Sequence, residues 1–194
     1  MAWDTARTKQ LLLDAAVEEF AEHGPEGARV ARVATRAGVN KERIYQYFGG
    51  KEKLFAAVLE CELQKLAAAV PLDEAQAKDL GDYAGRVFDY HRQHPHFVRL
   101  LAWEGLQCQD WVAAQCERTD HYDEKIAAIA AAQRAGALTG AVAPGQLMHT
   151  VISLTVSWFN LPQLSRMLVP AVADEGATAQ RAALVEAVRR LTAT

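Results

Sequence analysis

The side chains of this chain that are best suited to bind phosphate groups lie between positions 28 and 53. This segment reads ARVARVATRAGVNKERIYQYFGGKEK and holds seven cationic residues but only two glutamates, a local net charge of +5. The cations are Arg29, Arg32, Arg36, Lys41, Arg43, Lys51 and Lys53. Guanidinium and ammonium groups donate strong hydrogen bonds to phosphates, so we expect this segment to contact an anionic partner.

The charge of the whole chain conceals this basic segment. The 194 residues carry 21 Lys and Arg against 24 Asp and Glu, which gives a net charge of -3. Residues 1–27 and residues 54–194 each sum to -4. Proteins that bind nucleic acid usually show a basic excess. The mild acidity does not exclude such a partner here, because the positive charge is concentrated in one segment.

The spacing of three small or apolar residues within the basic segment predicts a helix-turn-helix. Ala34 is small where two helices approach closely, Gly38 tolerates the positive φ of a tight turn, and Ile44 closes the core from the second helix. We therefore expect one helix over residues 30–37 and a second over residues 41–48.

The second of these helices would expose polar side chains at its N-terminal end, which enters the major groove of DNA in this motif. Lys and Arg donate to guanine, Gln pairs with adenine, and Glu accepts from cytosine. The predicted base-reading residues are Lys41, Glu42, Arg43 and Gln46. Tyr45, Tyr47 and Lys51 are suited to phosphate contacts, which set the register without reading bases. Either tyrosine could instead pack against the first helix.

The stretch AGVNKERIYQYFGGKEKLF resembles the DNA-binding signature of the TetR family of transcriptional regulators, and LLLDAAVEEFAEHGPEGARVARVA resembles that family's first helix and turn. The specific match covers about residues 8–59. The resemblance implies a homodimeric regulator, commonly a repressor, with a helix-turn-helix head and a C-terminal body that binds ligand and dimerises. It also implies base-facing positions for residues 41–43 and Gln46, and phosphate-facing positions for Tyr45, Tyr47 and Lys51.

The sequence departs from that family's pattern at four positions. Arg29 stands where Ser or Thr usually caps a helix, which costs about 1 kcal/mol unless Arg29 gains a phosphate contact instead. Glu19 stands where Leu is common, which predicts looser packing of the first helix. Glu42 and Arg43 replace residues that are more often small, so the operator sequence cannot be inferred from a relative.

Composition and periodicity predict an all-α fold of about nine helices. Alanine, the strongest helix former, makes up about a fifth of the residues, and the alternation typical of strands is missing. Proline and glycine mark the breaks, including the stretch 162–176. We expect a three-helix DNA-binding head over residues 1–52 and a helical body for ligand binding and dimerisation over residues 53–194.

Apolar stripes on two helices near the C-terminus predict a dimer interface. A helix over residues 145–161 is apolar on two sides and needs two partners, and a helix over 178–191 carries a further stripe. The predicted interface residues are Leu147, Val151, Leu154, Trp158, Leu184, Val188 and Leu191. The alternative is that they form the core of a single chain. A twofold dimer would require a roughly palindromic operator.

Aromatic residues of the central helices are candidates to line a ligand pocket, although such residues more often form plain core. The aromatic candidates are Phe88, Phe97, Trp103, Trp111, Tyr122, Trp158 and Phe159. Glu104, Gln115 and Arg118 could supply the few polar groups that orient a ligand in an apolar cavity. The sequence does not name this ligand.

The cysteines and the apolar segments favour a cytoplasmic protein. Cys61, Cys108 and Cys116 are odd in number and lack a framework spacing, which argues against a secreted, disulfide-linked domain. Cys108 and Cys116 lie eight residues apart, about 12 Å along one helix, which is too far for a disulfide, so we expect these two to be buried, reduced thiols. A redox sensor stays an alternative. No segment is long and apolar enough to span a bilayer, and no secretory signal is visible, so no membrane partner is expected.

Histidines and catalytic patterns do not favour an enzyme or a metalloprotein. His91, His94 and His96 lack the i, i+4 spacing of a metal site, so capping or surface roles are favoured over a metal. A helical-bundle enzyme would need convergent catalytic groups, and not even a Glu-x-x-His pair is present. We therefore expect no metal, no cofactor and no catalysis. A third class, a helical protein that only binds ligand or acts as a scaffold, would leave the basic head unexplained.

The predicted function is therefore a ligand-responsive transcriptional regulator. We expect a repressor that binds a palindromic double-stranded DNA operator as a homodimer and is released by a small, largely apolar effector.

Overall fold

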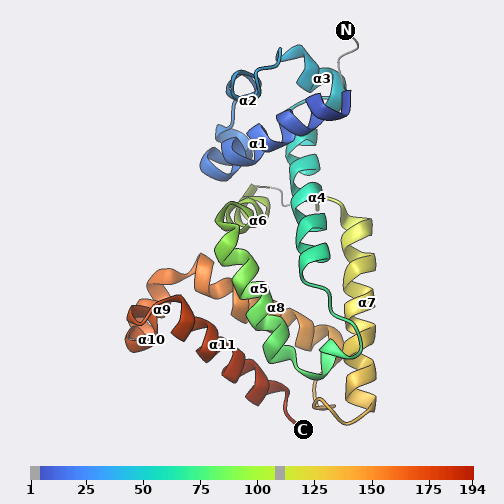
Figure 1. Cartoon of the computed structure of the whole chain (residues 1–194), viewed down its shortest axis with the longest axis vertical. Coiled ribbons are helices and arrows are strands. Elements are labelled where there is room, and N and C mark those ends of the chain that lie inside the picture. The colour runs from blue at the N-terminus through green and yellow to red at the C-terminus, as the bar shows by residue number, and fades with distance from the viewer. Residues whose placement is uncertain (1–4, 108–111) are drawn as a thin grey trace. The chain divides into compact units, whose positions relative to one another are not determined.

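The computed structural model describes residues 5–107 and 112–194, and every regular element in these ranges is helical (Figure 1). This part of the chain forms eleven α-helices and one short 3₁₀ helix, which confirms the predicted all-α fold. The number exceeds nine because the stretch 162–176, expected as a break, forms two short helices, α9 (Pro162–Leu168) and α10 (Pro170–Asp174). Each begins with a proline, which the first turn of a helix tolerates.

The chain divides into two compact units. The first comprises Met1–Lys65 and Pro95–Gln115, and the second comprises Leu66–His94 and Cys116–Thr194. The first unit therefore contains α6 (Pro95–Gln107) and most of α4 (Lys51–Ala69) in addition to residues 5–50. The two units show which residues pack together, and not which residues share a function. The functional boundary after residue 52 therefore stays a prediction.

The first unit is held together by an apolar core beneath its short helices. Its helices are α1 (Thr5–Gly27), α2 (Val30–Ala37), α3 (Glu42–Phe48), the greater part of α4, and α6. Phe20 of α1 meets Phe55 of α4 edge to face, with ring centroids 5.0 Å apart. Val33 of α2 and Ile44 of α3 are buried in the same cluster, so both short helices are fixed to α1 and α4 by burial.

The turn between α2 and α3 is closed by Gly38, which adopts a left-handed φ of 65°. Its N–H donates to the carbonyl of Thr35 at 3.2 Å, and the N–H of Val39 donates to the carbonyl of Ala34 at 3.0 Å. Together these bonds form a Schellman motif, which satisfies carbonyls at the end of α2. The turn needs a residue that adopts a positive φ without strain.

A second glycine allows α6 to approach α1 closely. α1 is kinked at Gly24, where φ is 67°. A Cβ atom at this position would lie 2.9 Å from the indole ring of Trp103 in α6. The indole N–H donates to the carbonyl of Ala21 at 3.4 Å. Trp103, a predicted ligand residue, therefore packs half-buried against the first helix.

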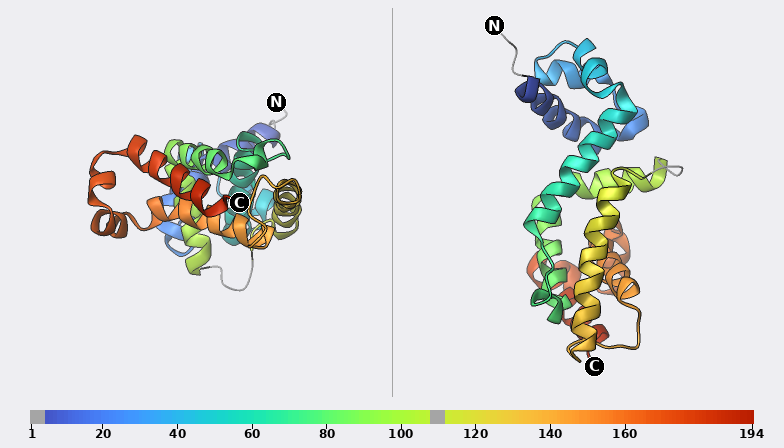
Figure 2. Two further views of the ribbon diagram at one scale, coloured as in Figure 1. Left: turned by 90° about the horizontal axis from the view of Figure 1, so that it is seen from below. Right: turned by 90° about the vertical axis from the view of Figure 1, so that its right-hand side faces the viewer.

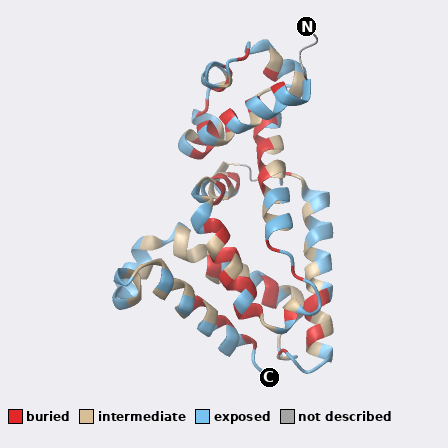
Figure 3. Cartoon of the chain, in the orientation of Figure 1, coloured by how far each residue is buried: buried red, intermediate tan, exposed pale blue. Residues whose placement is uncertain are grey.

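Close packing of α5 against α11 organises the second unit. Its elements are η1 (Gln76–Lys78), α5 (Leu80–Gln93), α7 (Gln115–Arg134), α8 (Pro144–Asn160), α9, α10 and α11 (Ala177–Thr192). α5, α8 and α11 pack against one another (Figures 1 and 2), and buried residues gather along α5 and α8 (Figure 3). A Cβ atom on Gly81 of α5 would lie 2.7 Å from the carbonyl oxygen of Val185 in α11, so only glycine permits this approach.

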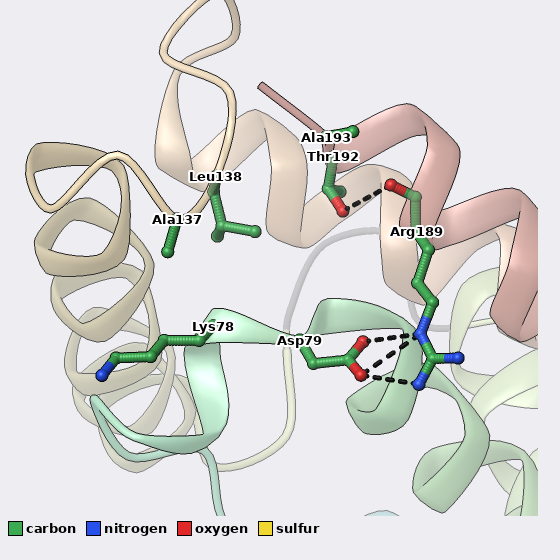
Figure 4. Close-up of a pocket in the computed structure, with 7 residues that line it drawn as sticks. All are labelled: Lys78, Asp79, Ala137, Leu138, Arg189, Thr192 and Ala193. Carbon is green, nitrogen blue, oxygen red and sulfur yellow. Dashed lines mark hydrogen bonds and ion pairs between the residues drawn. The ribbon is translucent and has the colours of Figure 1, made fainter.

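Two ion pairs add charge complementarity to the α5–α11 contact. Asp79 accepts from Arg189 at 2.6 Å, and Asp89 accepts from Arg181 at 2.7 Å. The Arg189 guanidinium holds the pKa of Asp79 below its usual value. Asp79 also caps α5 by accepting from the N–H of Asp82 at 3.0 Å. The Asp79–Arg189 pair lies in the wall of a cavity of about 280 Å³, where each charge satisfies the other (Figure 4).

Replacing Gly38 by alanine tests the turn between α2 and α3. No atom lies within 4 Å of the position that the new Cβ would occupy, so the cost is conformational, and we expect the free energy of unfolding to fall by about 1 kcal/mol. Gly105→Ala, in open space on α6, is the matched control and should raise that free energy by about 0.5–1 kcal/mol. Urea denaturation of both variants provides the measurement, and equal effects would contradict the assigned turn.

Candidate nucleic-acid interface

Helix α3 has one buried anchor and a polar surface. Ile44 is 0% exposed, whereas Glu42 and Gln46 are exposed and lie four residues apart on one side of the helix. Lys41, also exposed, directly precedes the helix, and Arg43 is half-buried. The four residues predicted to read bases are therefore gathered at and around α3.

Two of these residues are joined to each other. The guanidinium of Arg43 donates to Oε1 of Gln46 at 2.7 Å, and it also lies 5.9 Å from the ring centroid of Tyr47. A side chain that is already oriented loses less conformational entropy on binding. The carboxamide N–H₂ of Gln46 is left to donate, while its oxygen is occupied by Arg43.

The residues predicted to contact phosphates differ in how they are held. Tyr45 is 55% exposed, so its hydroxyl is accessible to a phosphate. Tyr47 is half-buried and packs against the core of the first unit, which favours the structural alternative for its ring. The ammonium of Lys51 donates to the carbonyls of Glu26 at 3.0 Å and Ala28 at 3.4 Å, which leaves one of its three N–H groups for a ligand.

Two of the seven cations are neutralised by acidic residues of α1, which charge counting along the sequence missed. Arg32 pairs with Glu19 at 2.6 Å, and Arg36 pairs with Glu18 at 3.0 Å. Arg29 is exposed and has no ion pair with any residue that the structure describes. The sequence did contain a signal for these two ion pairs. Arg32 and Arg36 are four residues apart and so share one face of α2, and two adjacent glutamates of α1 are their partners.

Glu19 corrects the expectation that the first helix packs more loosely at this position. It is 1% exposed and does not loosen α1, because its carboxylate accepts from the N–H of Arg29 at 2.8 Å and from Nε of Arg32 at 2.7 Å. Burial by itself raises the pKa of a carboxyl group, but these two hydrogen bonds and the positive charge of Arg32 together lower the pKa of Glu19. Arg29 lacks a side-chain cap, as expected, but its backbone N–H finds an acceptor in another helix.

The predicted dimer residues fall into two sets. Four of them are at most 3% exposed within their own chain, as the alternative of a single-chain core expects: Leu147, Val151, Leu184 and Val188. Leu154 and Trp158 are half-buried, and Leu191 is 55% exposed. Only this second set keeps apolar surface for a partner.

The predicted ligand residues are distributed over both units. Phe97, Trp103, Glu104 and Gln115 belong to the first unit, whereas Phe88, Arg118, Tyr122, Trp158 and Phe159 belong to the second, and Trp111 lies outside the described residues. Glu104 is buried and accepts from the N–H of Ala113 at 2.9 Å. The ring of Phe88 lies 5.1 Å from that of Phe159. These contacts are structural, and the role of the set in ligand binding stays a prediction.

Trp158 lines a cavity of about 230 Å³ between α8, α9 and α11, together with Leu154, Leu164 and Leu168. None of the other predicted ligand residues that the structure describes lines it. The cavity is mostly apolar in its side chains. Leu168, which lines it, and the preceding residue Met167 are each 71% exposed.

The histidines each have a separate role. His94 contacts the carbonyl of Tyr90 at 2.9 Å and stacks on its ring, whereas His96 pairs with Glu62 at 2.9 Å. Burial lowers the pKa of His91 to about 4, so its imidazole is neutral at pH 7. No group of three potential metal ligands occurs among the residues that the structure describes.

Of the two cysteines predicted to be buried, the prediction is wrong for Cys116 and is not tested for Cys108. Cys116 is exposed and Cys61 is half-buried, and both are free thiols, while Cys108 lies outside the described residues. Cys116 corrects the expectation of a buried thiol, because the beginning of α7 faces solvent. Of the helices in the described ranges, none has the length and hydropathy needed to cross a membrane.

Two known protein families match this chain, one in its N-terminal part and one in its C-terminal part. Residues 12–58 match the family described as bacterial regulatory proteins, tetR family, and residues 79–190 match the tetracyclin repressor-like C-terminal domain. The HTH-type transcriptional repressor SCO4008 of Streptomyces coelicolor is 38% identical over 191 residues, which covers 98% of this chain and 97% of that protein.

A relative that matches half of the chain and a solved structure agree with this family match. The HTH-type transcriptional repressor NicS of Pseudomonas putida is 39% identical over 104 residues, which covers 52% of this chain and 49% of that protein. The crystal structure of SCO4942 from Streptomyces coelicolor, described as a transcriptional regulator, superposes with a TM-score of 0.82 and 36% identity, covering 95% of this chain and 98% of the other.

Alanine substitutions of Gln46 and Lys51 separate base reading from phosphate binding. Gln46→Ala should relax discrimination at one or two base positions and change affinity little for unrelated DNA. Lys51→Ala should weaken binding to all sequences and reduce the slope of log affinity against log salt by about one unit per head.

Fluorescence anisotropy with matched and mutated DNA duplexes measures both effects. Lys78→Ala removes the same charge from an exposed residue of the second unit and is the control. Unchanged base preference in the Gln46 variant would show that α3 docks in another register.

Proposed function

Because the chain belongs to the TetR family of transcriptional regulators, we propose that it is a ligand-responsive repressor that binds a palindromic operator as a homodimer. Members of this family are DNA-binding regulators and not enzymes. The observation that carries the proposal is α3 itself, whose buried Ile44 fixes a helix with exposed polar residues on a basic head. The word repressor in the names of the relatives SCO4008 and NicS supports the direction of regulation.

In this proposal α3 lies in the major groove, where Lys41, Glu42, Arg43 and Gln46 contact base edges. Tyr45, Arg29 and the remaining N–H of Lys51 contact the flanking phosphates. Tyr47, whose half-buried ring packs on the core, contributes its hydroxyl to the same phosphates. The five cations without a partner carboxylate on α1 supply the attraction that brings the head to DNA, and they do so more strongly at low salt.

The proposed dimer surface consists of exposed and half-buried apolar side chains of α8, α9 and α11. Leu154, Trp158 and Leu191 remain from the sequence prediction, and Met167 and Leu168 of α9 extend it. A second copy of the chain is the proposed occupant, because a twofold axis would cover the same apolar surface on both subunits. The two recognition helices would then lie about 34–36 Å apart on a palindromic site.

The second unit is the proposed effector-binding and dimerisation domain, and a small, largely apolar molecule is the proposed effector. Binding of such a molecule must favour a conformation with low operator affinity. A coupling free energy of about 1–3 kcal/mol would change that affinity 5- to 150-fold. Since the operator lies on DNA, we place the protein in the cytoplasm.

Selection of bound duplexes from a random DNA pool by the purified protein tests operator recognition. We expect recovery of one palindromic sequence, bound with a steep salt dependence. Addition of candidate apolar molecules to that complex should release the DNA in at least one case. Binding that is indifferent to sequence would contradict the proposed function, and DNA binding that a ligand strengthens would contradict the direction of regulation.

Charged substitutions on α9 test the dimer surface. Met167→Asp and Leu168→Asp should shift the protein from dimer to monomer, because a buried carboxylate without a partner opposes association. Sedimentation velocity measures the shift. Leu106→Asp, at an apolar residue of the first unit that is 67% exposed, is the control and should leave the dimer intact. A dimer that persists in both α9 variants would place the interface elsewhere.

A further inference from the structure

The turn between α1 and α2 is held by charged side chains that come from three helices. Arg32 of α2 donates to the carbonyl of Gly27 at 3.0 Å, and Lys51 of α4 donates to the carbonyl of Glu26 at 3.0 Å. Glu19 of α1 accepts the N–H of Arg29 at 2.8 Å. The carbonyls and the amide of this short turn therefore each point toward a side-chain partner within the first unit.

Glu19 lies at the centre of this arrangement. Its Oε1 atom accepts three hydrogen bonds or ion-pair contacts, from the Arg29 amide at 2.8 Å, Nε of Arg32 at 2.7 Å and Nη2 of Arg32 at 2.6 Å. The side chain is 1% exposed. A buried carboxylate that loses such partners is costly, so the arrangement resists rotation of the turn.

Fixing the amide of Arg29 also fixes the direction of its side chain. The residue is extended, with φ -121° and ψ 120°, and its N–H is drawn inward to Glu19. Its guanidinium is exposed, whereas the guanidinium groups of Arg32 and Arg36 are engaged by acidic residues of α1. Arg29 is thus the arginine around α2 that remains available to an external anion.

We propose that Glu19 is a positioning residue for operator binding, which holds the α1–α2 turn so that Arg29 reaches a DNA phosphate. This inference rests on the proposed function, because it needs an operator. Glu19 does not touch DNA, and its charge by itself repels phosphates. Its contribution to affinity passes through the backbone of Arg29.

The sign of the effect distinguishes positioning from simple electrostatics. Removing any acidic residue from the head should tighten DNA binding slightly, since it raises the positive charge near the phosphates. Removing Glu19 should instead weaken binding, because the turn loses its acceptor and Arg29 its fixed direction. Glu18 is the adjacent acid, is exposed and pairs with Arg36, so it provides a control with the same change in charge.

The test compares Glu19→Leu with Glu18→Leu, using the operator recovered by selection and fluorescence anisotropy over a range of salt concentrations. We expect Glu19→Leu to weaken binding about 3- to 10-fold and to reduce the salt slope by about 0.9 per head, as for one lost phosphate contact. Glu18→Leu should leave binding unchanged or tighten it. Glu19→Gln, which keeps an acceptor for the Arg29 amide, should fall between Glu19→Leu and the unmodified protein.

A double-mutant cycle with Arg29→Ala shows whether Glu19 acts through Arg29. In the Arg29→Ala background, Glu19→Leu should lower the midpoint of thermal unfolding but no longer weaken DNA binding. Equal weakening in both backgrounds would overturn the proposal, as would Glu19→Leu binding that matches Glu18→Leu. Circular dichroism selects a temperature at which all variants are folded, and the Gln variant carries the cycle if the Leu variant does not fold.

Failure of this inference can be distinguished from failure of the proposed function. If the unmodified protein selects no DNA sequence, the proposed function fails first. If it selects an operator and the Glu19 and Glu18 variants bind it alike, the proposed function stands and only the positioning role is overturned.

Discussion

The burial of Ile44 and Val33 beneath two very short helices is the constraint on which the DNA-binding head depends. α3 has seven residues and α2 has eight, and helices of this length are not stable in water by themselves. Their helical state comes from packing on Phe20 and Phe55, which are 0% exposed. The polar surface of α3 is therefore a consequence of the core, because the anchoring of Ile44 decides which residues point outward.

Electrostatics in the head follows from the same packing. Bringing α2 against α1 places Arg32 and Arg36 beside Glu19 and Glu18, so part of the positive charge holds the two helices together. The remaining cations stay available for DNA. Partly buried charges that are paired serve the structure, and exposed charges without partners serve attraction to an anionic partner. One cluster of basic residues is thus divided between two tasks by the fold.

In the second unit, the main constraint is the close approach of α5 and α11. Glycines at positions 81 and 85 remove the side chains that would collide, and Asp79 and Asp89 then pair with arginines of α11. Of the residues of α11, Leu184, Val188 and Thr192 are buried within their own chain. The apolar surface that remains on α8, α9 and α11 is the surface proposed for the second subunit.

Sequence alone determined the elements whose signals are local. The positions of Ala34, Gly38 and Ile44 span eleven residues, and the turn they predict is closed by a left-handed glycine and a Schellman motif. Helical composition and the match to a TetR-like signature likewise predicted the all-α fold and the family. The two short helices after Asn160 were missed, because proline marks the beginning of a helix as readily as a break.

Tertiary structure decided the contacts between residues that are distant along the chain. The partners of Glu19 lie 10 and 13 residues away, and Trp103 reaches Ala21 across 82 residues, so no pattern within a single helix identifies these pairs. The apolar stripe with Leu147 and Val151 likewise looked the same whether it faced its own chain or a partner. Periodicity shows that a face is buried, but only the packed structure shows what buries it.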